Sequence, residues 1–335
     1  MTQTKNGNLI LNNIMYIAQA YKSLHEAWRY IVGALAIFFI GWQFIGILPL
    51  TLASFLRVNN LEQWMESAQT TFSDLFEGES NLYLILILFT FIGGLIVLLL
   101  VVKYLHKQSL TQLTTAREKV DWNRIFFAFF SWAAFSILTT AIAYYSAPEM
   151  FEFNFNLLPF LGLLAISLLL LPLQTSFEEY FFRGYLMQGI GVMAGNRWVP
   201  LLITSIGFGL LHIMNPEIEK LGYEVISVYI GMGLFLGIIT LMDEGLELAL
   251  GFHAANNMII SLLVTADWTA LQTNSILIDR TEPSALGQIL PIFIILPILT
   301  FIYARKYKWS NWKEKLTGEV RPVASDLSHT SNRDN

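Results

Sequence analysis

The chain has 335 residues, of which 55% are hydrophobic and only 13% are charged, and its mean hydropathy is +0.54. Because a soluble domain averages about 25% charged residues, this composition predicts a protein whose main solvent is lipid. The net charge of -5 gives no reason to expect nucleic acid as a partner, and the absence of cysteine excludes disulfides, thiolate metal sites and a cysteine nucleophile.

Apolar stretches long enough to cross a hydrocarbon core, which takes about 20 residues, recur along the chain between polar connections. They predict an all-α fold, a polytopic membrane bundle of about eight transmembrane helices. The predicted spans are residues 28–56, 82–104, 125–145, 157–175, 198–213, 225–241, 246–264 and 286–304.

The predicted spans divide the chain into three parts. We expect residues 1–27 to form a polar cytoplasmic flank, residues 28–308 the membrane domain, and residues 309–335 a polar, disordered cytoplasmic tail. Residues 105–124 are expected to form a surface segment that joins the second and third spans.

Lysine and arginine are enriched in cytoplasmic connections near span ends, so they indicate orientation. In this chain they gather between the second and third spans and after the last one, whereas connections on the opposite side are acidic or neutral. An even number of spans with both termini in the cytoplasm satisfies this alternation. We therefore expect an integral multi-pass membrane protein. Its expected location is a bacterial plasma membrane. The acidic residues before the seventh span, Asp243, Glu244 and Glu247, are interpreted as a solvated loop.

The stretch FEEYFFRGYL brings three ionisable residues to the end of the fourth span. Such residues are costly in lipid, and their presence suggests a function. On a helix, Glu179 and Arg183 are four residues apart and can form an ion pair, whereas Glu178 points roughly 100° away and is left unpaired. The alternative is that Glu178 simply ends the helix at the cytoplasmic surface, where water solvates it.

Two later spans also carry polar residues. His212 lies in the fifth span, one helical turn after Phe208, and His253 and Asn257 lie four residues apart in the seventh. A single buried histidine is usually structural, but these residues could satisfy one another in a cavity shared with Glu178. There a carboxylate beside a histidine could deprotonate water for attack on a carbonyl, and N–H donors could stabilise the oxyanion. The cluster therefore favours amide hydrolysis without a covalent intermediate.

Three motifs carry a resemblance to a known family. In chain order they are Glu178-Glu179-x-x-x-Arg183, Phe208-x-x-x-His212 and His253-x-x-x-Asn257. Together they resemble the CAAX-protease and bacteriocin-processing (CPBP) family of intramembrane glutamic endopeptidases, over roughly residues 126–263. Eukaryotic members of that family cleave prenylated C-terminal tripeptides. The resemblance therefore implies a peptide hydrolase whose partners are membrane lipid and a lipidated or membrane-embedded peptide.

The resemblance also implies a role for each motif residue. Glu178 would be the general base, and His212 would help it hold the attacking water. His253 and Asn257 would form the oxyanion hole, and no cofactor or metal would be required. Supporting roles would fall to the three remaining motif residues, which are Glu179, Arg183 and Phe208.

Two other interpretations stay open from the residues alone. Two histidines and a glutamate could ligate zinc in a zinc-dependent intramembrane protease, although an HExxH motif is absent and Asn257 is a poor zinc ligand. A non-catalytic membrane scaffold, immunity or transport protein could also use this fold, with a polar cluster that is structural or binds a proton.

Overall fold

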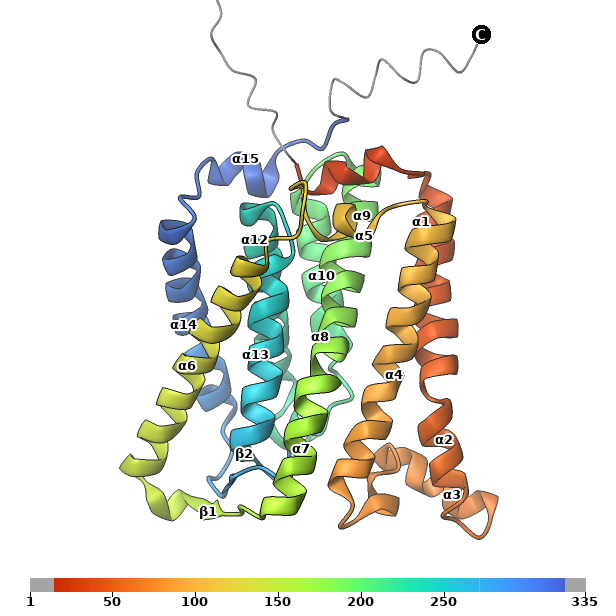
Figure 1. Ribbon diagram of the computed structural model, residues 1–335. Helices are drawn as coiled ribbons and strands as arrows, with labels where there is room; N and C mark the ends of the chain where they lie inside the picture. Colours follow the sequence, from red (N-terminus) through yellow and green to blue (C-terminus); the bar gives the residue numbers. More distant parts are fainter. Residues whose placement is uncertain (1–14, 271, 323–335) are drawn as a thin grey trace, which may run out of the picture.

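The computed structural model describes residues 15–270 and 272–322. These residues form a bundle of helices that run side by side, with a small sheet at one end, as Figure 1 shows. The predicted all-α fold is therefore confirmed.

The bundle is built from long helices and from π-helical segments (η2, η5 and η7) that continue them. In chain order these elements are α1 (Ala27–Leu35), η2 (Ala36–Gly46), α2 (Leu48–Phe55), α4 (Ser80–Leu100), η5 (Val101–Leu105), α6 (Trp122–Ser146), α7 (Leu157–Leu169), α8 (Leu171–Glu179), η7 (Tyr180–Leu186), α9 (Met187–Ala194), α10 (Trp198–Leu210), α12 (Ile226–Asp243), α13 (Glu247–Leu263) and α14 (Ala285–Lys306). Short helices lie in the connections and flanks, namely η1 (Ile17–Lys22), α3 (Leu61–Ser67), η3 (Ala68–Thr70), η4 (Ser73–Phe76), α5 (Leu110–Thr114), η6 (Pro148–Met150), α11 (Pro216–Leu221), η8 (Tyr223–Val225) and α15 (Trp312–Thr317). In the small sheet, β3 (Leu277–Asp279) pairs antiparallel with β1 (Phe151–Phe153) and parallel with β2 (Val264–Thr265).

Six helical stretches in the described residues are long and apolar enough to cross a membrane. They are Ala27–Phe55, Ser80–Leu105, Trp122–Ser146, Leu157–Ala194, Tyr223–Asp243 and Ala285–Lys306. The remaining two of the predicted spans are shorter, because α10 has 13 residues and α13 has 17. α13 contacts α6, α7, α8 and α12, so it is surrounded largely by protein and its length need not match a bilayer. Six of the eight predicted spans are therefore long enough on their own for a crossing, which takes about 20 residues, and α10 and α13 are shorter.

The fourth membrane helix is much longer than predicted. It begins at Leu157 as expected, but it continues through Glu178 to Ala194, over 38 residues. An irregularity at Leu170 separates α7 from α8, because Pro172 has no backbone N–H to continue the helical hydrogen bonds. The helix continues past the charged stretch because those charges are bonded within the protein and need no water.

This extension changes the position of Glu178 in the bundle. Glu178 lies about 32 Å from Leu157 and about 24 Å from Ala194 along the helix, at about 1.5 Å per residue. The helix α10 runs back from Trp198, and His212 follows that residue by about 21 Å on the same scale. Glu178 and His212 are therefore at similar distances from the turn that joins α9 to α10.

Both flanks of the membrane domain pack onto it where the structure describes them. In the N-terminal flank, Tyr16 is fully buried, and its hydroxyl donates to the carbonyl oxygen of Arg183 at 3.1 Å. After α14 the chain forms α15, and Val320 beyond it is buried. The expected disordered tail is therefore wrong for residues 309–322, and the rest of both flanks lies outside the described residues.

The connection between α4 and α6 is also more buried than predicted. Residues 105–124 were expected to form a surface segment, but His106, Leu113 and Thr114 are almost completely buried. His106 Nε2 lies 2.9 Å from the hydroxyl of Tyr185, and α5 contacts η1 and η7. This connection is therefore part of the packed end of the bundle.

The turn between α12 and α13, residues 243–247, is an acidic turn that is buried rather than solvated. Asp243 and Glu247 are only 5% and 0% exposed, so the predicted solvated loop was wrong. Arg117 donates from Nη2 to Asp243 Oδ2 at 2.9 Å and from Nη1 to Glu247 Oε2 at 3.1 Å. Arg124 donates to Asp243 as well. Arg117, from the connection between α4 and α6, and Arg124, from the first turn of α6, thus neutralise the acidic turn.

Glu244 links the acidic turn to both flanks. Its Oε2 accepts from the backbone N–H of Tyr16 at 2.7 Å, and its Oε1 accepts from Arg197 Nη1 at 2.9 Å. Lys315 Nζ lies 3.7 Å from the same Oε1. These partners come from distant parts of the chain, so the composition of the turn alone could not reveal that it is buried.

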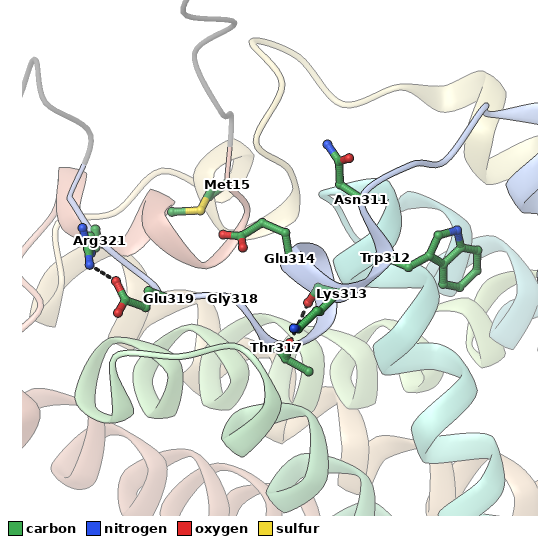
Figure 2. A pocket seen from close by; sticks show the side chains of 9 residues that line it. All are labelled: Met15, Asn311, Trp312, Lys313, Glu314, Thr317, Gly318, Glu319 and Arg321. Atoms are coloured by element: carbon green, nitrogen blue, oxygen red, sulfur yellow. Dashed lines mark hydrogen bonds and ion pairs between the residues drawn. The ribbon is translucent and has the colours of Figure 1, made fainter.

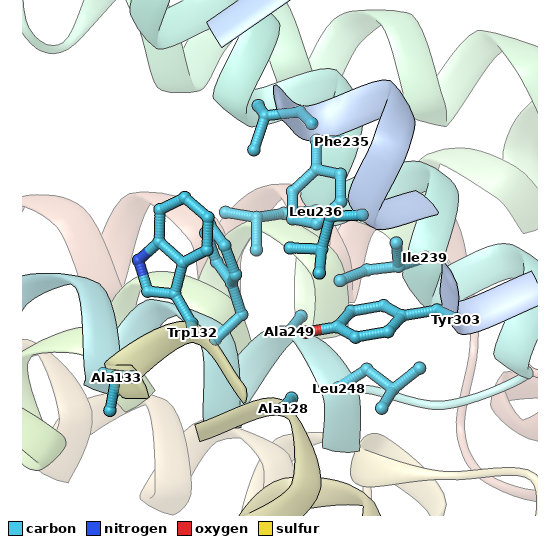
Figure 3. Packing of buried hydrophobic residues seen from close by; sticks show 13 residues of the cluster. Ala128, Trp132, Ala133, Phe235, Leu236, Ile239, Leu248, Ala249 and Tyr303 are labelled. Carbon is cyan, nitrogen blue, oxygen red and sulfur yellow. The ribbon is translucent and has the colours of Figure 1, made fainter. Parts of the chain in front are cut away.

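An apolar core joins α6, α12, α13 and α14. Figure 3 shows its buried side chains, which include Trp132 of α6, Phe235 of α12, Ala249 of α13 and Tyr303 of α14. The rings of Trp132 and Phe252 have centroids 4.5 Å apart. Gly251 lets α13 approach α6 closely, since a Cβ there would lie 2.0 Å from the carbonyl oxygen of Ile125. This packing holds α13, which carries two of the motif residues, against α6.

Candidate active site

Glu178 lies on α8 with two polar side chains beside its carboxylate. Gln174, one turn earlier, donates from Nε2 to Glu178 Oε1 at 2.6 Å. His253 of α13 places its Nε2 3.5 Å from Glu178 Oε2. Glu178 is 8% exposed, so the expectation that it is unpaired and the alternative that it is solvated at a membrane surface were both wrong.

The predicted ion pair between Glu179 and Arg183 is present, with Nη1 2.9 Å from Oε1, and both side chains are fully buried. Arg183 Nη2 also donates to the carbonyl oxygen of Gly233 on α12 at 3.2 Å. The guanidinium carbon lies 4.4 Å from the centre of the Phe208 ring on α10. Arg183 therefore connects three helices, and it lies in the π-helical segment η7, a kind of segment that occurs frequently at functional sites.

His253 connects the two glutamates. Its Nδ1 lies 2.7 Å from Glu179 Oε1, whereas its Nε2 faces Glu178 Oε2. Because an ionised carboxylate only accepts hydrogen bonds, Nδ1 carries a proton in this arrangement. Nε2 and Glu178 Oε2 can then share a second proton or bind the same water molecule. The geometry thus links His253 directly to both glutamates.

His212 lies just beyond the end of α10. Its Nδ1 donates to the carbonyl oxygen of Phe208 at 2.7 Å, and its ring stacks on Tyr229 with centroids 4.2 Å apart. The Phe208 ring contacts both His212 and His253, at centroid distances of 4.8 and 6.0 Å. Within the described residues His212 makes no direct hydrogen bond to Glu178, and Phe208 is the contact that links the two histidines.

Asn257 lies one turn after His253 on α13. Its Nδ2 donates to Gln174 Oε1 at 3.0 Å, and its Oδ1 accepts from Asn256 Nδ2 at 3.1 Å. Gln174 therefore bridges Asn257 and Glu178. The structure brings Glu178, His253 and Asn257 together in one polar cluster. We call these three residues, together with Glu179 and Arg183, the glutamate cluster.

Exposure divides the motif residues into two groups. Residues expected to touch water or substrate keep some accessible surface, namely Glu178 (8%), His253 (6%) and the half-buried His212 and Asn257. The expected supporting residues keep almost none, namely Glu179 (0%), Arg183 (0%) and Phe208 (2%). A small molecule such as water can therefore reach the first group, whereas the second group acts from inside the protein.

The sequence alone did not reveal the role of four residues near the motifs. Trp132 Nε1 donates to Asn256 Oδ1 at 3.1 Å, Gln174 bonds Glu178, and Tyr229 stacks on a motif histidine. The spacing of four residues between Gln174 and Glu178 could have revealed the contact between these two. Nothing in the sequence connects Trp132 or Tyr229 with the motifs, because their contacts depend on how separate helices pack.

The zinc interpretation needs two histidines and a glutamate around one position. His253 lies beside Glu178 and Glu179, whereas His212 contacts Phe208 and Tyr229. In the part of the chain that the structure describes, no group of three or more histidine, aspartate or glutamate side chains is arranged to hold a metal ion. The two histidines therefore lie in different surroundings.

A surface pocket of about 860 Å³ lies apart from these residues, beside α15. Figure 2 shows the side chains that line it, which include Met15, Trp312, Glu314 and Arg321. The residues that line it include none of the motif residues, so this pocket is not the candidate active site.

Comparison with known proteins agrees with the motifs. Residues 158–259 match the family described as type II CAAX prenyl endopeptidase Rce1-like. This segment is an Rce1-like domain. It contains every motif residue, so the resemblance to the CPBP family is confirmed, over a shorter range than the predicted 126–263. The Rce1-like match and the six apolar helices together support an integral membrane protein.

The chain is also similar to the uncharacterized protein YyaK of Bacillus subtilis (strain 168). The two are 34% identical over 167 residues, which are 50% of this chain and 56% of YyaK. The chain thus spans about half the length of this curated relative. No solved structure matches the chain significantly.

Proposed function

We propose that the protein is an intramembrane endopeptidase that hydrolyses a peptide bond of a lipidated or membrane-embedded substrate with water activated by Glu178. The observation that carries this proposal is a buried yet accessible carboxylate beside a histidine, with Glu178 Oε2 3.5 Å from His253 Nε2. Gln174 holds the other oxygen, Oε1, which leaves Oε2 to take a proton from water. The Rce1-like family of residues 158–259 supports the same class of reaction.

Hydrolysis would proceed in two steps. Glu178 takes a proton from water as the water oxygen bonds to the substrate's carbonyl carbon, and the negative charge moves to the carbonyl oxygen. The C–N bond then breaks, and the proton passes from Glu178 to the departing amine, which restores the carboxylate. His212 would help to hold the water, because Nδ1 is bonded to Phe208 and Nε2 can accept a hydrogen bond.

His253 and Asn257 would stabilise the oxyanion. The amide of Asn257 has two N–H groups, and the bond to Gln174 uses one of them, so the second can donate to the substrate. His253 would act through Nε2, which faces Glu178, while its Nδ1 stays bonded to Glu179.

The substrate would reach the glutamate cluster sideways from the lipid. A prenyl group or a transmembrane segment already lies in the bilayer, and such a route suits both kinds of peptide. We expect the cluster to open toward the cytoplasm, the side on which the pattern of lysine and arginine puts both termini. The expected location remains the plasma membrane of a bacterium.

The proposal can be tested with purified protein in liposomes and two quenched fluorogenic probes, a peptide with an S-farnesyl cysteine near its C-terminus and a transmembrane peptide. Wild-type protein should cleave at least one probe, and the isosteric Glu178→Gln variant should not. Equal cleavage by both proteins would overturn the role of Glu178, and cleavage by neither would overturn the proposal in favour of a scaffold, immunity or transport role. Activity lost in chelator and restored by zinc would favour the zinc protease. Comparing peptidomes of cells with wild-type protein and with Glu178→Ala would then identify natural substrates.

A further inference from the structure

The bond from Gln174 to Glu178 is the last of four hydrogen bonds in a row. Trp132 Nε1 donates to Asn256 Oδ1 at 3.1 Å, and Asn256 Nδ2 donates to Asn257 Oδ1 at 3.1 Å. Asn257 Nδ2 donates to Gln174 Oε1 at 3.0 Å, and Gln174 Nε2 donates to Glu178 Oε1 at 2.6 Å. We call the first four of these residues the amide relay. It crosses from α6 to α13 and then to α8.

All the hydrogen bonds of the amide relay have the same donor-to-acceptor direction, from Trp132 toward Glu178. An indole N–H can only donate a hydrogen bond, and an ionised carboxylate can only accept one. The three amides between Trp132 and Glu178 must therefore all point the same way, with each oxygen toward Trp132 and each NH2 group toward Glu178. Turning any one of them would set two donors or two acceptors against each other, which is costly where the groups are shielded from water.

The first residue of the amide relay is fixed by the apolar core. Trp132 is 8% exposed, and its ring packs on Phe252 and stacks on Phe135 with centroids 4.5 and 5.1 Å apart. Figure 3 shows it among the other core side chains. The indole N–H therefore has a defined direction before any ligand binds. Trp132 also lies outside residues 158–259, so the amide relay ties the Rce1-like domain to a helix that the family match does not include.

We infer that Trp132, Asn256 and Gln174 are positioning residues for the proposed hydrolysis. They turn the NH2 group of Asn257, rather than its carbonyl oxygen, toward the oxyanion, and they hold Glu178 Oε1 so that Oε2 faces the water. A reversed Asn257 would present a partly negative oxygen to a negative one and would raise the barrier. The inference rests on the proposed function, because it assigns these residues a role in that reaction.

A double-mutant cycle in kcat tests the inference, with the two fluorogenic probes in liposomes. Gln174→Met removes both bonds of its amide at similar volume and should lower kcat about 100-fold with KM nearly unchanged, while Trp132→Phe should lower it about 10-fold. The two side chains have no direct hydrogen bond, so independent roles would multiply to about 1000-fold. If the amide relay acts as a unit, the double variant will be no slower than Gln174→Met alone.

Gln188→Met is the matched control. Gln188 is a fully buried glutamine of the same long helix, and it bonds Gln108 and the backbone of Gln112. Its substitution should lower the melting temperature but leave kcat per folded molecule unchanged. If Trp132→Phe does not fold, Asn256→Leu interrupts the amide relay at the next residue and replaces it in the cycle.

The outcomes separate the two proposals. Multiplicative effects in the cycle, or a loss of kcat in Gln188→Met as large as in Gln174→Met, would overturn the amide relay while the proposed function stands. Activity in Glu178→Gln equal to that of wild-type protein, or no cleavage by either, would overturn the proposed function, and the role of the amide relay with it.

Discussion

The acidic turn and the glutamate cluster are both buried groups of charges, but they differ in how completely their carboxylates are neutralised. Asp243 in the acidic turn receives bonds from Arg117 and Arg124 and a further one from the indole of Trp309 at 3.0 Å. In the glutamate cluster a single arginine, Arg183, pairs with Glu179 and makes no ion pair with Glu178.

The same difference is visible atom by atom. Within the described residues, Glu179 Oε2 and Arg183 Nε are buried without a hydrogen-bond partner, and near the acidic turn only Arg197 Nε is in this position. A saturated group of charges holds helices and flanks together but offers nothing to a reactant. A cluster with an accessible carboxylate oxygen and spare donors costs stability and is the arrangement that chemistry requires. Replacing a carboxylate by its amide should therefore lower activity more than stability in the glutamate cluster, and stability more than activity in the acidic turn.

Glu178→Gln should have the largest effect on activity. The substitution keeps the shape of the side chain but removes the proton acceptor, so kcat should fall by at least about 100-fold and by as much as about 10,000-fold. The melting temperature should change little, because Gln can still accept from Gln174. Probe cleavage and thermal unfolding measure the two effects. Substantial activity in a well-folded Glu178→Gln protein would contradict the assignment of the general base.

Arg183→Ala should be the most destabilising change in the glutamate cluster. It leaves Glu179 as a buried charge without its cation, which costs about 3–5 kcal/mol when a buried pair is broken. Folded yield, melting temperature and activity should all decrease. A variant with normal stability and no activity would instead indicate that Arg183 contacts the reacting groups directly.

Asn257→Ala distinguishes the oxyanion hole from a metal site. Loss of one oxyanion donor should lower kcat by about 100- to 1000-fold, with substrate binding nearly unchanged. If His212 and His253 held zinc instead, this change would matter far less. Elemental analysis of purified wild-type protein should find no stoichiometric zinc. Zinc that is present and is lost in both histidine variants would overturn the mechanism and leave the membrane fold intact.

The sequence predicted what depends on spacing within one helix or on a motif. The pair of Glu179 and Arg183 and the membrane helices followed from helical periodicity and apolar length. The end of the fourth helix was wrong because a charge next to an apolar run suggests a membrane boundary, unless partners from other helices are known. For Glu178 those partners included His253, which is 75 positions away.

The acidic turn could not be predicted for the same reason. Within the turn itself there is no positive residue, and its cations are supplied by Arg117, Arg124 and Arg197. Their approach depends on how the connection before α6, the first turn of α6 and the turn before α10 pack at the end of the bundle. Similarly, the amide relay became visible only when α6, α8 and α13 were placed together.

Asp243→Asn is the counterpart of Glu178→Gln in the acidic turn. It removes the charge that two arginines neutralise and leaves those cations without their partner, so the free energy of unfolding should fall by about 1.5–3 kcal/mol. Activity per folded molecule should stay close to that of wild-type protein. Denaturation in detergent measures the first effect and probe cleavage the second. A fall in kcat as large as that of Glu178→Gln would contradict the division between the two groups of charges.

Glu244→Gln should have the smallest effect, and it tests whether the two groups of charges are independent. A glutamine retains one oxygen, which can accept from Arg197, but its NH2 group would face the N–H of Tyr16, so the free energy of unfolding should fall by only about 0.5–1.5 kcal/mol. The Tyr16 hydroxyl also donates to the carbonyl oxygen of Arg183, which makes it a direct connection to the glutamate cluster. Amide hydrogen exchange should become faster in η1 and remain unchanged in α8, with normal kcat. Faster exchange in α8 together with a lower kcat would show that the N-terminal flank helps to hold the glutamate cluster in place.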